Sequence, residues 1–197
     1  ARLALADGKR ALARGQLGDA RTKLLLALKL SPGYAEALLA LSAVETRAGQ
    51  PAAAIKAARE ALAAEPDRVE TLTSLASLLW AEPDRKAKEE ALALSDRAAA
   101  LRPDEPALLR VAAERYAEWG DAPRALERLD RYLSTASPRE SAEMALLREA
   151  LARQVRGSGE AAGGGEAGGI PEELASEAVD RWRKAQVLVE SGDFESF

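Results

Sequence analysis

The sequence repeats one pattern of residue types at a nearly fixed interval, and this repetition constrains the fold more than any other feature. Its first copy places Ala20, Leu24 and Ala27 three and four residues apart and follows them with Pro32. Residues at that spacing share one side of an α-helix, and a proline ends the helix. Later copies of the pattern are Ala54, Ala58, Ala61 and Pro66; Ala91, Ser95, Ala98 and Pro103; and, less regularly, Ala125, Leu129, Tyr132 and Pro138. The chain is therefore predicted to be a series of helical units.

The composition favours helices that pack closely through small side chains. Hydrophobic residues make up 47% of the 197 residues, but aromatic residues make up only 4%. Strands favour β-branched and aromatic residues, whereas alanine is the strongest helix former. We therefore expect an all-α fold.

The first unit resembles a tetratricopeptide repeat, a helical hairpin of about 34 residues. Counted from Ala1, the small residues Gly8, Ala11 and Ala20 and the closing Pro32 stand where the family pattern has Gly, Tyr, Ala and Pro. The resemblance implies a right-handed α-solenoid of helix-turn-helix repeats, in which the two helices of each repeat approach closely at the small residues.

The repeat register predicts the domain organisation. We expect an array over residues 1–155, with hairpins at about 1–34, 35–68, 69–105 and 106–138 and a capping helix at 139–155. Residues 156–169 are rich in glycine and are typical of a flexible linker. Residues 170–197 are predicted to form a C-terminal helix, or the first half of a further repeat.

The third unit is longer than the others. Pro66 and Pro103 lie 37 residues apart, whereas Pro32 and Pro66 lie 34 apart. The segment 81–85 contains Pro83 and an aspartate, which favour turns, and insertions in repeat arrays usually fall in loops. We therefore expect the three extra residues in this turn.

Catalysis and cofactor binding are not expected of these residues. The chain has no histidine and no cysteine, which removes the commonest general base, the thiol nucleophile and the usual transition-metal ligands. The net charge is −4, with both signs mixed along the chain, which argues against nucleic acid. No apolar run approaches the roughly 20 residues of a membrane span. The usage of alanine and arginine suggests a bacterial protein, and a cytoplasmic location is favoured over a periplasmic one.

The resemblance implies a protein-interaction scaffold or adaptor that holds a peptide or helix in a concave groove. In the family, the first helix of each repeat lines this groove. Carried onto this chain, the lining comprises Leu5, Lys9, Leu12, Leu39, Ala43, Arg47, Thr73, Ser77, Trp80, Arg110 and Glu114. The leucines and Trp80 would bury apolar ligand surface, and Lys9, Arg47 and Arg110 would select acidic groups. An alternative for Trp80 is packing against the inserted turn or the C-terminal helix.

Two other roles stay open at the level of sequence. The array could be a regulatory or docking segment of a larger enzyme whose catalytic domain lies outside this chain. Alternatively, the C-terminal helix could dock in its own groove or in that of a neighbouring chain, which would give self-association. Trp182, Leu188 and Phe194 would then make the contact.

Overall fold

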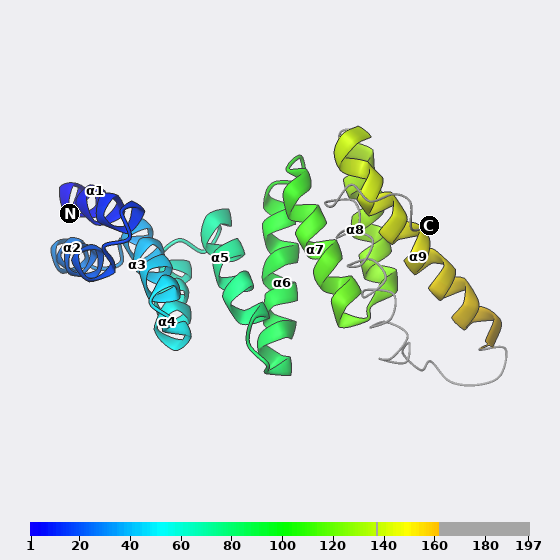
Figure 1. Ribbon diagram of the computed structural model, residues 1–197, viewed down its shortest axis with the longest axis horizontal. Helices are drawn as coiled ribbons and strands as arrows, with labels where there is room; N and C mark the ends of the chain where they lie inside the picture. Colours follow the sequence, from blue (N-terminus) through cyan, green and yellow to red (C-terminus); the bar gives the residue numbers. More distant parts are fainter. Residues whose placement is uncertain (137, 162–197) are drawn as a thin grey trace, which may run out of the picture. The chain divides into compact units, whose positions relative to one another are not determined.

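The computed structural model describes residues 1–136 and 138–161, and this part of the chain is helical with short connections (Figure 1). The expected all-α fold is confirmed. Residues 162–169 of the linker expected at 156–169 lie outside the described residues. So does the C-terminal helix expected at 170–197, with Trp182, Leu188 and Phe194, and both stay predictions. The described helices fall into two units that divide after Leu101.

The first unit consists of three consecutive helical hairpins (Figure 1). The helices are α1 (Arg2–Ala13) and α2 (Leu17–Leu30), α3 (Ala35–Arg47) and α4 (Pro51–Ala64), and α5 (Val69–Trp80) and α6 (Arg85–Leu101). Glycine permits the tight turns in the first two hairpins: Gly15 has φ +74° and Gly49 has φ +69°. Only glycine adopts such angles without steric cost.

The small residues of the repeated pattern form the contact between the helices of each hairpin. Ala54, Ala58 and Ala61 are fully buried, and so are their counterparts Ala20 and Ala27 in the first hairpin. Burial without large side chains lets the helix backbones approach closely. The core continues from the first hairpin into the second. This part of it comprises Leu5, Ala11, Ala20, Leu24, Ala27, Ala37, Ala40 and Val44.

The extra residues of the third hairpin extend a helix and not the turn, so the expected insertion at 81–85 is wrong. Helix α6 has 17 residues, whereas α2 and α4 have 14 each. It begins six residues before Ala91, whereas α4 begins three residues before the equivalent Ala54. Asp84 stabilises the start of the longer helix, because its carboxylate accepts a hydrogen bond of 3.0 Å from the backbone N–H of Ala87.

The second unit contains a fourth hairpin and a long final helix. They are α7 (Pro106–Trp119), α8 (Ala122–Thr135) and α9 (Pro138–Ala161). Met144, Leu147 and Leu151 are buried on α9, which contacts α8. Helix α9 continues to Ala161, six residues beyond the expected boundary at 155, so the first part of the expected linker is helical.

Candidate functional site

The candidate site in the first unit is the surface formed by the first helix of each hairpin, α1, α3 and α5. We call this the A-helix surface. Ala43 on α3 and Ser77 on α5 occupy the same place in the repeat, 34 residues apart, and both are exposed. Leu39 and Thr73 stand four residues earlier and are half-buried. We call these four uncharged side chains, which stand at two equivalent places on α3 and α5, the neutral strip.

Leu5 does not belong to this surface, and its predicted role in the groove is wrong. Its side chain is only 5% exposed and lies in the core of the first two hairpins. Its counterparts Leu39 and Thr73 are half-buried, so the place in the repeat alone does not decide exposure. Leu12 is half-buried and packs against the same core.

Two polar contacts tie α1 to α3 along the A-helix surface. The ammonium group of Lys9 pairs with the carboxylate of Glu36. The guanidinium of Arg47 donates a hydrogen bond of 3.0 Å to the backbone carbonyl of Leu12. The bond from Lys9 lowers the pKa of Glu36 below its ordinary value, although partial burial acts in the opposite direction. Two of the three cations that were expected to select an acidic ligand, Lys9 and Arg47, are thus engaged by the protein itself.

The hydroxyl groups on α5 are also engaged locally. Thr73 donates to the carbonyl of Val69 at 3.0 Å, and Ser77 donates to the carbonyl of Thr73 at 2.9 Å. Such bonds to the preceding turn satisfy a hydroxyl within its own helix. At Thr73 and Ser77, the surface therefore offers a ligand mainly methyl and methylene groups, because the hydroxyl protons are donated within α5.

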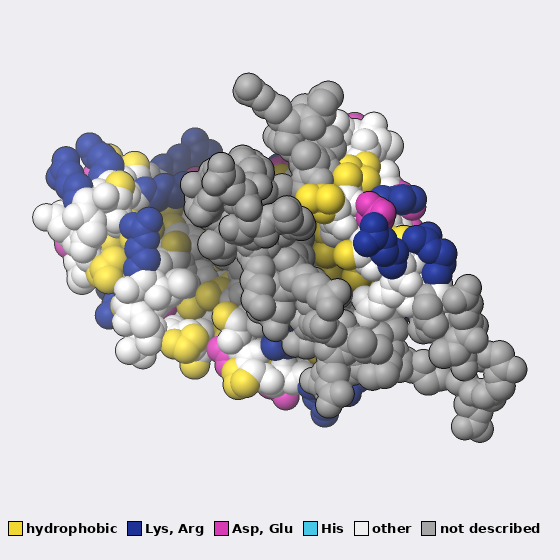
Figure 2. All heavy atoms as spheres, turned by 45° about the vertical axis from the view of Figure 1, so that its right-hand side comes forward, with side chains coloured by type: hydrophobic (Ala, Val, Ile, Leu, Met, Phe, Trp, Pro, Cys, Tyr) yellow, Lys and Arg dark blue, Asp and Glu magenta, His cyan; other side chains and the backbone are white. Residues whose placement is uncertain are grey.

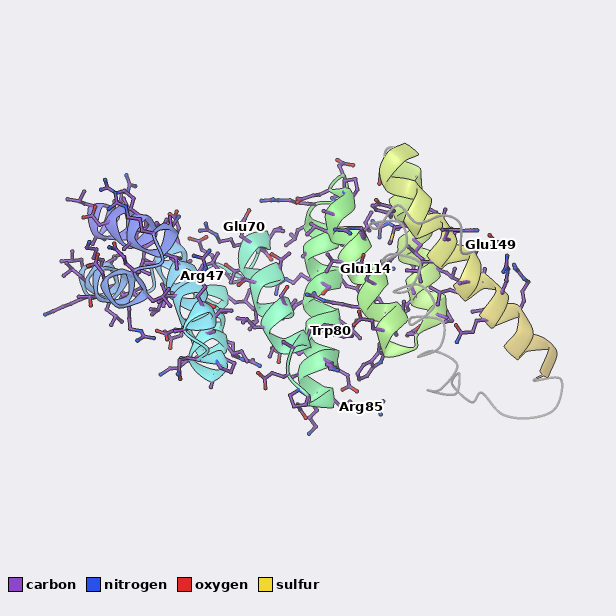
Figure 3. All side chains as sticks on the ribbon, in the orientation of Figure 1. Arg47, Glu70, Trp80, Arg85, Glu114 and Glu149 are labelled. Atoms are coloured by element: carbon purple, nitrogen blue, oxygen red, sulfur yellow. The ribbon has the colours of Figure 1, made fainter. Side chains whose placement is uncertain are left out.

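Trp80 ends α5 and is half-buried beside the first turn of α6 (Figure 3). The ammonium group of Lys88 lies 5.5 Å from the centre of its ring, within the range of a cation–π contact. Lys88 lies near the start of α6, the helix that the extra residues lengthen. The alternative in which Trp80 packs against the inserted segment therefore holds for part of its surface, although its partner is a helix and not a loop.

In the second unit, Arg110 and Glu114 lie four residues apart on α7, with 3.5 Å between a guanidinium nitrogen and a carboxylate oxygen. Figure 3 labels Glu114 on this helix. The neighbouring Arg115 is only 8% exposed, and its burial lowers the pKa of its guanidinium, while Glu118 and Glu114 act to raise it. Arg115 was not among the site residues predicted from the sequence.

A part-buried ion pair between the first two hairpins was also not predicted from the sequence. Arg21 on α2 donates from Nε to the carboxylate of Glu45 on α3 at 2.7 Å, and a second nitrogen contacts the other oxygen. The side chain of Glu45 is 10% exposed. The two hydrogen bonds and the charge of Glu45 raise the pKa of Arg21. The pair fixes how the second hairpin meets the first.

The described residues hold no group of three or more acidic, histidine or cysteine side chains that could bind a metal ion. Among the helices of that same part, we find none with the length and apolar character needed to cross a membrane. Figure 2 shows Lys and Arg side chains among hydrophobic ones over the left-hand, N-terminal part of the visible face.

One family model matches part of the chain. Residues 35–78 match the family model described as tetratricopeptide repeat. This stretch covers the second hairpin and most of helix α5. No curated protein sequence matches the chain.

Solved structures resemble the chain over most of its length. The crystal structure of the MamA protein has 20% sequence identity and a TM-score of 0.67, and the match covers 100% of this chain and 96% of that one. YrrB, described as a tetratricopeptide repeat protein with an unusual peptide-binding site, has 15% identity and a TM-score of 0.68, with coverage of 97% and 91%. O-GlcNAc transferase from Thermobaculum terrenum has 18% identity and a TM-score of 0.57, but only 25% of its chain is covered, against 68% here. Identities this low show the fold alone.

Proposed function

Because the chain is a tetratricopeptide repeat protein, we propose that its first unit binds a segment of another protein on the A-helix surface. The fold suggests a protein-interaction scaffold, and proteins with this repeat are generally non-catalytic. The more specific proposal concerns the ligand, which is a peptide or a helix that crosses α3 and α5.

The neutral strip of the A-helix surface is the observation that carries this proposal. Ala43 and Ser77 are exposed at equivalent places on neighbouring helices, and Leu39 and Thr73 lie half-buried beside them. Small side chains at the centre let a ligand backbone approach closely, and the flanking apolar groups offer surface to bury.

The charges of the surface favour a neutral or apolar ligand segment over an acidic one. Lys9 is paired with Glu36, and Arg47 is bonded to the carbonyl of Leu12. An acidic ligand would have to displace Glu36 from Lys9, or the carbonyl of Leu12 from Arg47. Exchanging one exposed polar contact for another adds little binding free energy. We therefore assign the two cations to the connection between α1 and α3.

Selection from a random peptide library displayed on phage, with the whole chain as bait, tests the proposal. We expect enriched peptides to bind at least tenfold more weakly to Ala43→Glu, because the new charge lies in the middle of the strip. The control is Ala63→Glu, which adds the same charge at an exposed alanine of α4, on the second helix of that hairpin. Enriched peptides that bind all three proteins equally would contradict a site on the A-helix surface.

A second candidate is a docking segment of a larger enzyme. The match to O-GlcNAc transferase from Thermobaculum terrenum favours this role. It covers only 25% of that enzyme's chain, so the enzyme contains a similarly folded segment as one part of a longer chain. The reading frame that surrounds the coding sequence tests this role. A catalytic domain in the same frame would support it, and a frame limited to helical repeats would contradict it.

A further inference from the structure

The first hairpin exposes one apolar side chain at a place that the next two hairpins bury. Leu3 on α1 is 73% exposed. Ala37 and Thr71 stand at the same place in the second and third hairpins, and both are 0% exposed. Leu3 therefore lies exposed on a side of the first helix that is buried in the second and third hairpins. We call this side of the first hairpin its N-terminal face.

Helix α2 contributes two more leucines to the N-terminal face. Leu26 is 50% exposed and Leu30 is 61% exposed, and residues four apart share one side of a helix. The counterpart of Leu26 in the third hairpin is Arg97, whose guanidinium lies 2.7 Å from the carboxylate of Asp67, at the end of the preceding hairpin. Side chains at this place therefore point toward the preceding hairpin.

The adjacent Leu25 lies on a different side of α2, although it is equally exposed at 50%. Its counterpart in the second hairpin is Arg59, which contacts Glu90 of the following hairpin at 2.6 Å. Side chains at this place point toward the following hairpin. Leu25 and Leu26 thus form a matched pair of exposed leucines that face in opposite directions along the array.

Charged side chains complete the N-terminal face beside the leucines. A hollow of about 260 Å³ between α1 and α2 is lined by Asp7, Arg10, Ala11, Arg14, Gln16, Asp19 and Lys23. Asp19 stands where the third hairpin has Glu90, the acid that receives an arginine from the hairpin before it. By analogy with that junction, the N-terminal face fits a helix that offers an apolar residue and an arginine.

Helix α9 of the second unit offers both groups. Its inner side is buried by Met144, Leu147 and Leu151, whereas Leu146 on its other side is 58% exposed. Arg153 stands two helical turns after Leu146, and its side chain is 70% exposed and contacts Glu149 at 2.5 Å. Residues seven apart lie on the same side of a helix. The chain therefore carries a helix with the chemistry that its own N-terminal face would accept.

We propose that two copies of this chain associate head to tail, with the outer side of α9 in one copy packed on the N-terminal face of the other. Leu146 would contact Leu26 and Leu30, and Arg153 would approach Asp19, whose carboxylate also pairs with Lys23 at 2.6 Å. The two contact surfaces differ, so the contact is heterologous and can continue into rings or longer assemblies. It leaves the proposed peptide surface free, so the two proposals stand or fall separately.

Sedimentation velocity of the full chain over a wide concentration range tests the proposal. We expect the average mass of the unmodified chain to rise with concentration. Leu26→Glu and Leu146→Glu should each stay monomeric, because each blocks one of the two surfaces. The matched control, Leu25→Glu, should associate like the unmodified chain. Circular dichroism should show unchanged helix content in all three variants, because the substituted leucines are exposed.

An equimolar mixture of Leu26→Glu and Leu146→Glu extends the test. Each variant keeps one intact surface, so the mixture should form dimers that go no further. Loss of association in Leu26→Glu but not in Leu146→Glu would overturn the role of α9. A chain that stays monomeric at every concentration would overturn the proposal and leave the N-terminal face to a different helix.

Discussion

The first and second hairpins fill the same helix contact with different residues. In the first, Gly8 faces Leu24, and a Cβ atom added to this glycine would lie 2.8 Å from the Cγ of Leu24. In the second, the counterparts are Ser42 and Ala58, both fully buried. The hydroxyl of Ser42 donates a hydrogen bond of 2.9 Å to the carbonyl of Ala54. In the first hairpin, the large Leu24 on the second helix thus faces a glycine on the first helix. In the second hairpin, the small Ala58 on the second helix is matched by Ser42 on the first helix, which is larger than glycine.

The two hairpins indicate that the repeat keeps the combined volume of the pair rather than the identity of either residue. A core at crystal-like density tolerates such exchanges when the total volume is kept. The serine adds a second requirement, because its buried hydroxyl needs an acceptor, and the carbonyl of Ala54 provides it. The two pairs should therefore be exchangeable together but not singly.

The greatest loss of stability is expected from Leu24→Ala, which should lower the free energy of unfolding by about 2–5 kcal/mol. Leu24 is fully buried, and the glycine opposite it cannot fill the space that is left. Urea denaturation measures the loss, and Leu26→Ala, at a 50% exposed leucine of the same helix, is the control.

Adding Gly8→Ser to Leu24→Ala recreates the pair of the second hairpin and tests the exchange directly. We expect the double variant to be more stable than the sum of the two single losses implies, because the pairs couple through one shared space. Additive losses would show that the two hairpins do not use the same rule.

A smaller loss, about 1–3 kcal/mol, is expected for Ala54→Leu, which overfills the contact beside Ser42. Ala54 is 0% exposed, and its carbonyl accepts the serine hydroxyl. Ala91→Leu at the equivalent place in the third hairpin should behave alike, since Ala91 is also 0% exposed. Thermal unfolding followed by circular dichroism detects both losses. Two neutral substitutions would mean that the helices of a hairpin can separate without cost.

Gly8→Ala should cost about 1 kcal/mol, since the clash with Leu24 outweighs the gain in helix propensity of up to about 1 kcal/mol. Gly18→Ala is the matched control on α2. A Cβ atom at Gly18 would meet nothing within 4 Å, so this substitution should stabilise the protein by about 0.4–1 kcal/mol. Urea denaturation of both variants measures the difference. If both substitutions stabilised the protein, or both destabilised it, a clash with Leu24 would not explain why the first hairpin has a glycine at position 8.

The hairpins could be predicted from the sequence because each depends on local spacing. Alanine stripes and closing prolines act within about 34 residues, and Gly15 and Gly49 lie in the turns between the helices that these residues define. The extra residues of the third hairpin were misplaced for a reason that is also local. Lys86, Lys88 and Glu89 are good helix formers, so the added residues extend α6 once Asp84 caps it.

The candidate site was harder to predict because its details depend on how neighbouring hairpins meet. Leu5 and Leu39 share a place in the repeat, yet Leu5 is buried in the core and Leu39 is half-buried. The pair of Arg21 with Glu45 spans two hairpins and 24 residues, and nothing in the spacing of one repeat predicts it. Contacts between repeats need three-dimensional geometry, whereas contacts within a repeat follow from its period.

The weakest effect is expected at the junction between the first two hairpins. Glu36 belongs to the second hairpin and pairs with Lys9 of the first, and this bond holds the pKa of Glu36 below its ordinary value of 4.5. A carboxyl whose pKa is depressed by folding adds stability above the unfolded pKa and loses it as the pH falls through the folded one. Glu36→Gln should therefore be less stable than the unmodified chain at pH 7, and the gap should close below about pH 4.

The side chains of Glu36 and Lys9 are 34% and 47% exposed, so screening by water keeps this gap below about 1 kcal/mol. Urea denaturation between pH 3 and pH 7 measures it, with Glu60→Gln on α4 as the control at an exposed glutamate. A gap of equal size at the two ends of this range would mean that the charge of Glu36 does not hold the two hairpins together. The junction would then depend on the apolar core and on the pair of Arg21 with Glu45, which also joins α2 to α3.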